Sequence, residues 1–439
     1  MSIKLRFAPS PTGYLHPGNM RTALVNWLFC KKHGGQFLLR MDDTDSERSM
    51  AEYEAAIMED IEWLGLAWDE LFKQQDRLGR YAVAAEKLRH DGRLYACYET
   101  PQELDIQRKQ LASRGLPPIY NRAALQLTEE QKTSYANEGR KPHWRFLLKE
   151  GEIEWNDLIR GISHFNPVHI SDPVLIREDG VPLYTLASVV DDGDMHITHV
   201  VRGEDHVTNT AVQMQIFDAL GFKRPEFAHM ALLKTKEGEL SKRTGGNDIR
   251  GLREAGILPM AINSLLARIG TSDPVEPFAD MQPLIEGFDF AKFGRAPANY
   301  DVAELEKLNE KILHQLPFYA VQDKLGFADE DFWLAVRANL TSLSEARQWW
   351  DIVQGSGIRG QGSEDKEFLA QAAELLPPEP WDESTYDAWI AAIKPSTDRK
   401  GKTLFMPLRK ALTGLEHGPE LKKLLPLLGA EKTRKRLAA

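Results

Sequence analysis

The chain has 439 residues and a formal net charge of −10, and it is 42% hydrophobic and 27% charged. This composition is typical of a globular protein with room for about two or three domains. No run of about 18 apolar residues is present, which excludes a membrane-spanning helix, and we expect no membrane partner. The N-terminal residues lack an apolar core behind a basic start, so we expect no secretory leader. Two cysteines, Cys30 and Cys97, cannot build a disulfide framework, and we expect a cytoplasmic enzyme.

The charge is distributed unevenly along the chain. From Lys394 to Ala439 there are 12 Lys and Arg residues against 4 Asp and Glu residues, a local charge of +8, so the remainder carries −18. An acidic protein still binds nucleic acid when its basic residues gather on one face. Charge alone leaves two interpretations open for this segment, a solvated basic end or a nucleic-acid surface.

The first 80 residues alternate between strand and helix. Residues 3–8 and 36–41 are short apolar-rich strands, and turn residues separate the first of them from a helix. Asn19 is a candidate cap for that helix, whose apolar residues recur at helical spacing. Ser49 opens a second helix that ends at Gly65. This alternation predicts a doubly wound parallel sheet.

The pattern breaks in the middle of the chain and then resumes. Residues 81–183 mix helical stretches with turn-rich segments and are interpreted as an insertion. A buried strand is then predicted at 197–201, followed by a helix to Leu220 that Thr208 or Asn209 caps. Another strand is predicted at 226–234, and beyond about residue 250 the spacing is helical.

Two segments have the residue types that phosphate binding needs. In the first, a strand ends near Arg6 and a helix begins just after His16 and Gly18. Helix N-termini present free N–H groups and a positive dipole end, which suit phosphate, and glycine lets a ligand approach the backbone. In the second, Lys242 lies on a glycine-containing loop past a predicted strand, where it can neutralise phosphoryl charge. Taken singly, the first segment is better interpreted as an ordinary strand–helix turn and the second as a solvated basic loop.

Together these segments resemble the His-Ile-Gly-His and Lys-Met-Ser-Lys-Ser motifs of class I aminoacyl-tRNA synthetases. The strings Arg6–Gly13 and Arg40–Asp45 look like the glutamyl/glutaminyl branch of that family. The stretches 189–192 and 197–206 are similar to the bacterial glutamyl-tRNA synthetases in particular. The resemblance runs through most of the first 270 residues and continues more weakly into the helical C-terminus.

The resemblance implies an α/β doubly wound (Rossmann-like) catalytic domain with an α+β insertion, followed by all-α C-terminal anticodon-binding domains. It places these parts as follows: the catalytic domain at 1–80 and 184–235, an acceptor-stem-binding insertion at 81–183, a stem-contact segment with the lysine loop at 236–315, and helical anticodon-binding domains at 316–439. The implied reaction joins L-glutamate to ATP as glutamyl-adenylate and then transfers glutamate to the terminal adenosine of tRNA-Glu. No enzyme nucleophile is needed, because catalysis rests on positioning and charge stabilisation.

Matching positions carry the family's residue roles to this sequence. His16 and Lys242 are the expected catalytic residues, stabilising phosphoryl charge. The ATP-binding set is Pro9, Ser10, Gly18, Asn19, Glu204, Leu232, Leu233 and Lys242. The glutamate-binding set is Arg6, Ala8, Ser10, Asp42, Tyr184 and Arg202. An arginine suits a side-chain carboxylate removed from water, and it rejects neutral glutamine. From its neighbours alone, Arg202 is better interpreted as a structural ion-pair partner of Glu204 or Asp205.

The sequence departs from the family pattern at three motif positions. Asn19 replaces the second histidine of the first motif, and Pro17 replaces its isoleucine. Glu239 replaces the first lysine of the second motif, although Lys236 lies close by. Asp42 stands where the family has glutamate, so a water or a small backbone shift must fill the gap of one methylene.

Metal and partner expectations follow from the same resemblance. Some bacterial relatives hold zinc in the insertion on a Tyr-x-Cys-x-Cys pattern, whereas this chain reads Tyr95-Ala96-Cys97-Tyr98-Glu99. One thiolate cannot close a tetrahedral site, so we expect no zinc. We expect Mg²⁺ with ATP, held largely by phosphate oxygens.

The basic C-terminal segment gains a candidate partner from the resemblance. Arg399 and Arg409 are candidate tRNA-binding residues, with salt-dependent contacts to the backbone or readout of splayed bases. A monomer is the family expectation. Two alternatives stay open: an enzyme that also charges tRNA-Gln with glutamate, and a catalytically silent tRNA-binding paralogue.

Overall fold

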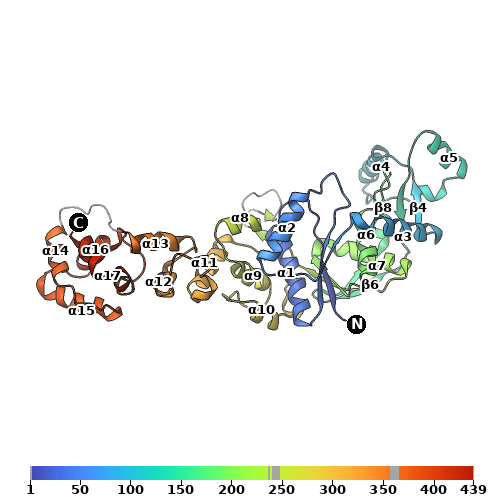
Figure 1. Ribbon diagram of the computed structural model, residues 1–439. Helices are drawn as coiled ribbons and strands as arrows, with labels where there is room; N and C mark the ends of the chain where they lie inside the picture. Colours follow the sequence, from blue (N-terminus) through green and yellow to red (C-terminus); the bar gives the residue numbers. More distant parts are fainter. Residues whose placement is uncertain (1, 236–237, 240–247, 356–364, 439) are drawn as a thin grey trace. The chain divides into compact units, whose positions relative to one another are not determined.

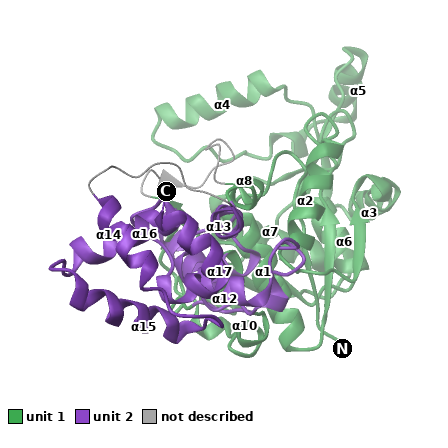
Figure 2. Cartoon of the chain, turned by 60° about the vertical axis from the view of Figure 1, so that its left-hand side comes forward, with its two compact units in different colours: residues 1–255, 262–276, 280–301 green, residues 256–261, 277–279, 302–439 purple. Residues whose placement is uncertain are grey.

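The computed structural model describes residues 2–235, 238–239, 248–355 and 365–438. These residues form two compact units, which Figure 2 colours separately. Unit 1 comprises residues 1–255, 262–276 and 280–301, and unit 2 comprises residues 256–261, 277–279 and 302–439. Each unit has its own packed interior and is described by itself.

Unit 1 opens with a three-stranded parallel sheet. Strand β2 (Gln36–Met41) lies between β1 (Lys4–Phe7) and β3 (Glu70–Lys73). Helices α1 (Pro17–Lys32) and α2 (Ala51–Trp63) make the two crossovers that parallel neighbours require. Five of the six β2 residues are buried, as expected for a central strand covered on both faces.

A second sheet has the order β7-β6-β10-β9. Its strands β9 (His199–Gly203), β10 (Glu226–Met230) and β6 (Ile153–Asp157) are parallel, and β7 (Gly161–Phe165) closes an antiparallel hairpin with β6. Helices α6 (Tyr184–Asp194) and α7 (Val207–Leu220) precede and follow β9 and pack against each other.

The two sheets meet at β1 and β9. The Thr198 backbone N–H donates to the Lys4 carbonyl at 2.9 Å, and the Lys4 N–H donates to Thr198 Oγ1 at 2.9 Å. From this seam the chain winds outward to β2 on one side and to β10 on the other. The seam is therefore a topological switch point, where open α/β sheets hold ligands beyond the carboxyl ends of the strands. The prediction of a doubly wound α/β fold is confirmed.

The insertion between β3 and α6 has its own small sheet (Figure 1). Strand β5 (His143–Phe146) pairs antiparallel with β4 (Leu94–Cys97) and β8 (Val174–Ile176). Helices α3 (Leu78–His90), α4 (Pro101–Ser113) and α5 (Glu129–Asn137) belong to the same segment. Thr100 and Thr128 begin α4 and α5 with reciprocal capping boxes.

Short elements follow the second sheet. They are β11 (Leu233–Thr235), β12 (Gly238–Glu239), α8 (Ile249–Glu254), α9 (Pro259–Arg268), α10 (Gln282–Glu286) and β13 (Ala298–Asn299). Strand β11 pairs parallel with β13, which fixes the segment that leaves β10.

The regular structure of unit 2 is helical in its described residues, with turns and loops between the helices. Its helices after residue 301 are α11 (Val302–Leu313), α12 (Glu330–Val336), α13 (Glu345–Gln354), α14 (Lys366–Glu374), α15 (Glu383–Ile393), α16 (Lys402–Thr413) and α17 (Leu421–Leu437). Trp333 and Trp389 are fully buried, and each indole N–H donates to a backbone carbonyl, of Leu316 and Ala372 respectively. The predicted all-α C-terminus is confirmed.

Three local predictions were wrong at element ends. Helix α1 begins at Pro17 with His16 as its cap, rather than after Asn19, because proline suits the first helical turn and the His16 ring accepts the free N–H groups. Helix α2 begins at Ala51 rather than Ser49, and α7 begins at Val207, ahead of both predicted caps.

The strand predicted at 226–234 is broken into β10 and β11. The break has a visible cause, because side chains engage the backbone groups between the two strands. Arg21 Nη1 donates to the Ala231 carbonyl at 2.9 Å, and Glu204 Oε1 accepts from the Leu232 N–H at 3.4 Å. Among the described residues, no helix is both long and apolar enough to cross a membrane.

A pair of helical glycines tests this packing. A methyl group on Gly193, in α6, would lie 2.4 Å from the Phe222 ring, whereas nothing lies within 4 Å of one on Gly79, in α3. We expect Gly193→Ala to lower the free energy of unfolding by about 1–3 kcal/mol. Gly79→Ala should raise it by up to about 1 kcal/mol, because alanine is the better helix former. Urea denaturation measures both, and equal stability of the two variants would contradict the packing of α6.

Candidate active site

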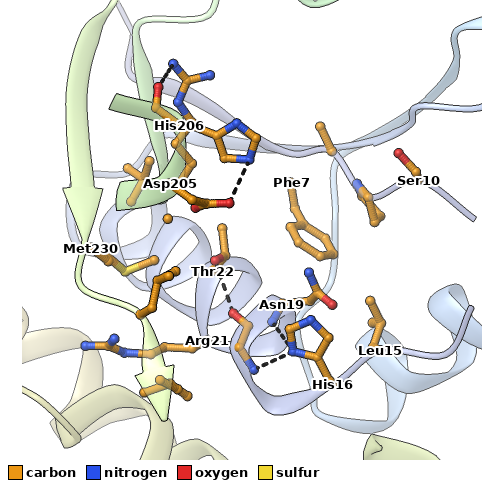
Figure 3. A pocket seen from close by; sticks show the side chains of 18 of the residues that line it. Phe7, Ser10, Leu15, His16, Asn19, Arg21, Thr22, Asp205, His206 and Met230 are labelled. Atoms are coloured by element: carbon orange, nitrogen blue, oxygen red, sulfur yellow. Dashed lines mark hydrogen bonds and ion pairs between the residues drawn. The ribbon is translucent and has the colours of Figure 1, made fainter. Parts of the chain in front are cut away.

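A pocket with a volume of about 590 Å³ lies at the switch point, between the carboxyl ends of β1 and β9 and the beginning of α1. Its lining includes most of the residues that the sequence predicts for ATP and glutamate: Arg6, Ala8, Pro9, Ser10, His16, Gly18, Asn19, Asp42, Tyr184, Arg202, Leu232 and Leu233. In Figure 3, His16 and Asn19 occupy one end of the pocket and His206 the other, with Phe7 between them. Segments nearly 200 residues apart in sequence therefore share one cavity.

His16 occupies the N-cap of α1. Its Nδ1 accepts from the backbone N–H groups of Gly18 at 3.1 Å and Asn19 at 3.3 Å (Figure 3). A ring nitrogen that accepts has no proton, so in the neutral imidazole the proton is on Nε2. The cap thus fixes the tautomer of His16 and presents an N–H donor on the far side of the ring.

Gly18 makes room for that ring. A Cβ at this position would lie 2.9 Å from His16 Cε1 and 3.0 Å from Nδ1, closer than real Cβ contacts allow. The helix that starts here has 16 residues, and its dipole places partial positive charge at this end of the pocket. The end formed by His16, Gly18 and Asn19 therefore suits a phosphate group.

Arg202, on β9, is the buried cation at the opposite end, with 5% of its surface exposed. Its Nη1 donates to the Tyr184 hydroxyl at 3.1 Å, and its Nη2 donates to Thr210 Oγ1 at 2.6 Å and to the His206 carbonyl at 3.3 Å. Its Nε donates to His229 Nε2 at 3.2 Å. Burial lowers the pKa of Arg202, which reflects the cost of keeping this charge away from water.

The alternative interpretation of Arg202 as an ion-pair partner of its neighbours is not supported. Glu204 instead accepts from Arg160 Nη1 at 2.6 Å, and Asp205 lies 3.6 Å from His206 Nε2. Within the part of the chain that the structure describes, every group that Arg202 hydrogen-bonds is uncharged. Its positive charge is therefore available to a ligand.

Arg6 and Arg40 are paired differently. Arg6 donates to both oxygens of Asp192, at 2.9 and 3.1 Å, and Arg40 Nη1 donates to Asp192 Oδ1 at 2.7 Å. Arg40 also holds both oxygens of Asp42, at 2.7 and 3.2 Å. All four side chains are buried. Arg40 Nε also lies 3.7 Å from Asp191, a carboxylate that it shares with Arg77. The charges of Arg6 and Arg40 are therefore matched by buried carboxylates, whereas Arg202 has no carboxylate partner among the described residues.

Burial affects the two carboxylates of this cluster unequally. Burial raises the pKa of Asp42 to about 6, although Arg40 opposes the shift. Burial also acts to raise the pKa of Asp192, but attraction by Arg6 and Arg40 outweighs it, and the pKa is lowered. Asp192 therefore stays ionised to a lower pH than a free aspartate, whereas Asp42 gains a proton as the pH falls through about 6.

Among the described residues that were predicted to bind ATP or glutamate, Glu204 does not line the pocket. Its Oε1 accepts from the Leu232 N–H and its Oε2 from Arg160, so it lies directly behind the Leu232–Leu233 backbone. Lys242 lies outside the described residues. Arg399 and Arg409 belong to unit 2, where Arg399 pairs with Asp365 and stacks over Phe368, and Arg409 Nη2 donates to the Pro419 carbonyl at 3.0 Å.

Sequence reasoning missed several groups that shape the pocket. Arg40, Asp191 and Asp192 lie in the strings that carry the family resemblance, yet only the structure shows that they form one network. Asp191 accepts from Gln74, Arg77 and Tyr81 and ties α6 to the start of the insertion. His229 and Asp157 fall in an apolar strand and a polar hairpin, where nothing in the sequence marks them.

A separate cluster in the insertion has metal-ligating atoms. Cys97, Glu99 and His143 offer one donor atom each within 4.8 Å of one another. Glu99 Oε1 accepts from the Tyr120 hydroxyl at 2.5 Å, while Glu99 Oε2 and His143 Nε2 are buried without a hydrogen-bond partner among the described residues. Burial raises the pKa of the Cys97 thiol to about 12, which opposes the thiolate that zinc requires. Three donors do not fit a closed four-ligand structural site.

The chain is similar to known proteins over its whole length. The model of "tRNA synthetases class I (E and Q), catalytic domain" matches residues 2–307, and that of "Anticodon binding domain" matches residues 359–439. Glutamate–tRNA ligase 1 of Rhizorhabdus wittichii is 54% identical, across 100% of this chain and 99% of the relative. Glutamate–tRNA ligase of Azospirillum brasilense is 53% identical, with the same coverage.

A solved structure has the same architecture. The glutamate tRNA ligase from Elizabethkingia meningosepticum, in complex with its amino acid, is 28% identical, with a TM-score of 0.86 across 100% of this chain and 98% of that chain. The chain therefore belongs to the class I tRNA synthetases of the glutamyl and glutaminyl type, and within them to the glutamate–tRNA ligases. Enzymes of this class use ATP, generally with Mg²⁺.

The cluster in the insertion can be tested directly. We expect purified protein to hold well under one equivalent of zinc, because the Cys97 thiol is protonated and a fourth ligand is missing from the described set. Elemental analysis after dialysis against zinc at low concentration measures this. A stoichiometric zinc signal that Cys97→Ser abolishes would contradict the prediction.

Proposed function

We propose that the switch-point pocket binds L-glutamate and ATP side by side and joins them as glutamyl-adenylate, with release of pyrophosphate. The glutamyl group then passes to the terminal adenosine of tRNA-Glu. In the first step the α-carboxylate attacks the α-phosphate, so the protein must hold two anions together and stabilise phosphoryl charge. A cavity with a buried cation at one end and a helix N-terminus at the other meets both needs.

The observation that carries this proposal is the state of Arg202. It is buried, and its hydrogen-bond partners in the described chain are neutral, so its charge is not spent on the protein. A side-chain carboxylate of the substrate satisfies it. Glutamine offers only a neutral amide and would leave the buried charge uncompensated, which penalises it strongly.

The other contacts to the glutamate substrate come from residues next to Arg202. Asp42 accepts the ammonium group of glutamate, and Arg40 holds that carboxylate in place from behind. Tyr184 contacts the substrate beside Arg202, and Arg6, Ala8 and Ser10 complete the glutamate site on the β1 side. Arg40 donates to both oxygens of Asp42, so the position of this carboxylate is fixed although its side chain is one methylene shorter than the family's usual glutamate.

ATP occupies the other half of the pocket in this proposal. The start of α1, with His16, Gly18 and Asn19, binds the phosphates next to Pro9 and Ser10. The backbone of Leu232 and Leu233 contacts adenine, and Glu204 contacts the ribose. Lys242 supplies the second positive group to the phosphates. Mg²⁺ is held largely by phosphate oxygens, since the one carboxylate-containing metal cluster among the described residues lies in the insertion.

The tRNA contacts belong to the rest of the chain. We propose that residues 81–183 bind the acceptor stem, residues 236–315 contact the stem, and residues 316–439 bind the anticodon, with Arg399 and Arg409 among the contacts. The match of the anticodon-binding model to residues 359–439 supports the last assignment. The protein acts as a monomer.

Substituting Lys242 and Lys236 one at a time distinguishes a specific catalytic role of Lys242 from an effect of the total charge of this segment. We expect Lys242→Ala to abolish glutamate-dependent ATP–pyrophosphate exchange, assayed with tRNA-Glu present, while tRNA binding is retained. The loss follows because, in this proposal, the Lys242 ammonium stabilises the charge that develops on the phosphoryl group. Lys236→Ala is the matched control, with the same charge change a few residues away, and should retain most of the activity.

Normal exchange by the Lys242→Ala variant would overturn the catalytic assignment. Equal losses in the two variants would contradict a specific role for Lys242 and indicate that only the total charge of the loop matters.

The raised pKa of Asp42 predicts that the KM for glutamate depends on pH. The ammonium-binding form of Asp42 is the carboxylate, so the KM for glutamate should rise about tenfold per unit as the pH falls below about 6. Unfolding does not cause this rise. The pKa of Asp42 is higher in the folded protein than its model value of 3.8, so this group's contribution to stability is fully present below 3.8 and is lost as the pH rises through about 6. Exchange kinetics between about pH 7.5 and 5.5 measure it.

Asp42→Asn is the control for this profile. It should have a high KM for glutamate at every pH, without the rise below about 6. A flat profile in the wild-type enzyme would show that Asp42 does not titrate against substrate.

A further inference from the structure

A line of three buried side chains runs across the sheet behind the pocket. Arg202 lies on β9, His229 on the neighbouring β10 and Asp157 at the end of β6, and none is more than 5% exposed. Arg202 Nε donates to His229 Nε2 at 3.2 Å, and His229 Nδ1 lies 2.5 Å from Asp157 Oδ2. Only the first of the three lines the pocket.

The register of the sheet holds this line together. His229 pairs directly with Arg202 in the parallel ladder between β10 and β9, and Phe227 of β10 pairs with Asp157 of β6. Neighbouring strands lie about 4.8 Å apart, so one imidazole spans the gap between the guanidinium and the carboxylate. The three side chains are therefore aligned by backbone pairing and not by loop conformation.

The hydrogen bonds also fix where each proton is. A guanidinium only donates, so His229 Nε2 must accept, and the single proton of the neutral ring is then on Nδ1, where it is donated to Asp157. The other oxygen of Asp157 accepts from the backbone N–H groups of Ile159 at 3.1 Å, Arg160 at 2.9 Å and His229 at 3.2 Å. The carboxylate is held on both sides and cannot rotate without losing bonds.

We propose that Asp157 and His229 are positioning residues for glutamate recognition: Asp157 fixes the tautomer of His229, and His229 fixes the guanidinium of Arg202 against the substrate carboxylate. The inference rests on the proposed role of Arg202 in binding glutamate. Neither residue touches the substrate. Their effect is on the orientation of Arg202, and through it on the choice of glutamate over glutamine.

Asp157→Asn tests the idea by changing one oxygen to nitrogen. If the amide oxygen keeps the three backbone N–H groups, its NH₂ faces His229 Nδ1 and drives the ring proton to Nε2, against the N–H of Arg202. If the amide flips, the NH₂ faces three backbone donors instead. We expect the KM for glutamate to rise about 10- to 100-fold, the loss of one hydrogen bond to a charged group, with the KM for ATP nearly unchanged.

Two substitutions of His229 provide a matched pair. Glutamine keeps an acceptor near the position of Nε2, so His229→Gln should retain a KM for glutamate close to that of the wild type. Asparagine reaches only the position of Nδ1, so His229→Asn should raise that KM as Asp157→Asn does. The relative rates with glutamate and glutamine should shift toward glutamine only in the variants with the raised KM.

Two controls complete the experiment, which uses the full-length enzyme with tRNA-Glu. Asp172→Asn alters another buried carboxylate, which accepts from Tyr95, Arg122 and the Leu148 N–H in the insertion, and should leave the KM for glutamate unchanged. Arg202→Ala tests the assignment on which the inference rests. An unchanged KM in Arg202→Ala would overturn the proposed glutamate site.

The remaining outcomes concern the positioning role itself. A raised KM in Arg202→Ala but not in Asp157→Asn would overturn that role and leave the glutamate site standing. Equal KM values in His229→Gln and His229→Asn, or a parallel rise in the KM for ATP, would also overturn it. Thermal denaturation of each variant, compared with Asp172→Asn, separates a loss of folding from a loss of recognition.

Discussion

A guanidinium group removed from water must find acceptors for its five N–H donors, and this requirement shapes the pocket. Arg6 and Arg40 meet it with carboxylates, which also cancel their charge. Arg202 meets it with a phenol, a hydroxyl, a carbonyl and an imidazole, all neutral. The buried side of the pocket therefore has two parts. In one, the charges of Arg6 and Arg40 are neutralised by carboxylates, and in the other the charge of Arg202 attracts an anion.

The second constraint acts on the backbone. Between β10 and β11 the ladder is interrupted because Arg21 and Glu204 engage the backbone groups of Ala231 and Leu232. The same interruption brings Leu232 and Leu233 to the lining of the pocket, with the Leu232 N–H bound by Glu204 and the Leu232 carbonyl by the Ala298 N–H. At the other wall, His16 replaces the usual small polar cap of α1 and is thereby fixed in orientation. In both places a bond that stabilises the fold also positions a group that faces the cavity.

The sequence predicted the sheet, the insertion and the helical C-terminus, because strand–helix alternation and apolar spacing are local patterns. That Arg6, His16 and Arg202 belong to one site was predicted from the family resemblance alone. No local sequence pattern brings residues 6 and 202 into one pocket. The starts of α1 and α7 were predicted too late in the chain, because His16 and His206 are the cap residues in place of the expected Asn19 and Thr208 or Asn209. The start of α2 was predicted slightly too early, because Met50 is the residue before its first turn. The Asp42–Arg40 bond was not predicted, although the two residues lie two apart on and after one strand. Lys242 lies outside the described residues, and its role stays a prediction from sequence.

The neutral imidazole behind Arg202 resolves a conflict between order and charge. A carboxylate in direct contact would orient the guanidinium well, as Asp192 does for Arg6, but it would also neutralise the attraction that a substrate carboxylate needs. With no partner, the charge would stay available but the side chain would keep its rotamer freedom. His229 separates the two effects, because it accepts one N–H of Arg202 while Asp157 lies one side chain further from the pocket. The electrostatic attraction between Asp157 and Arg202 weakens with distance. The orienting effect does not depend on that distance, because Asp157 orients the His229 ring and the ring orients Arg202 through hydrogen bonds. A relay of this kind is what a site needs if it must hold a cation rigidly and still leave its charge for the ligand.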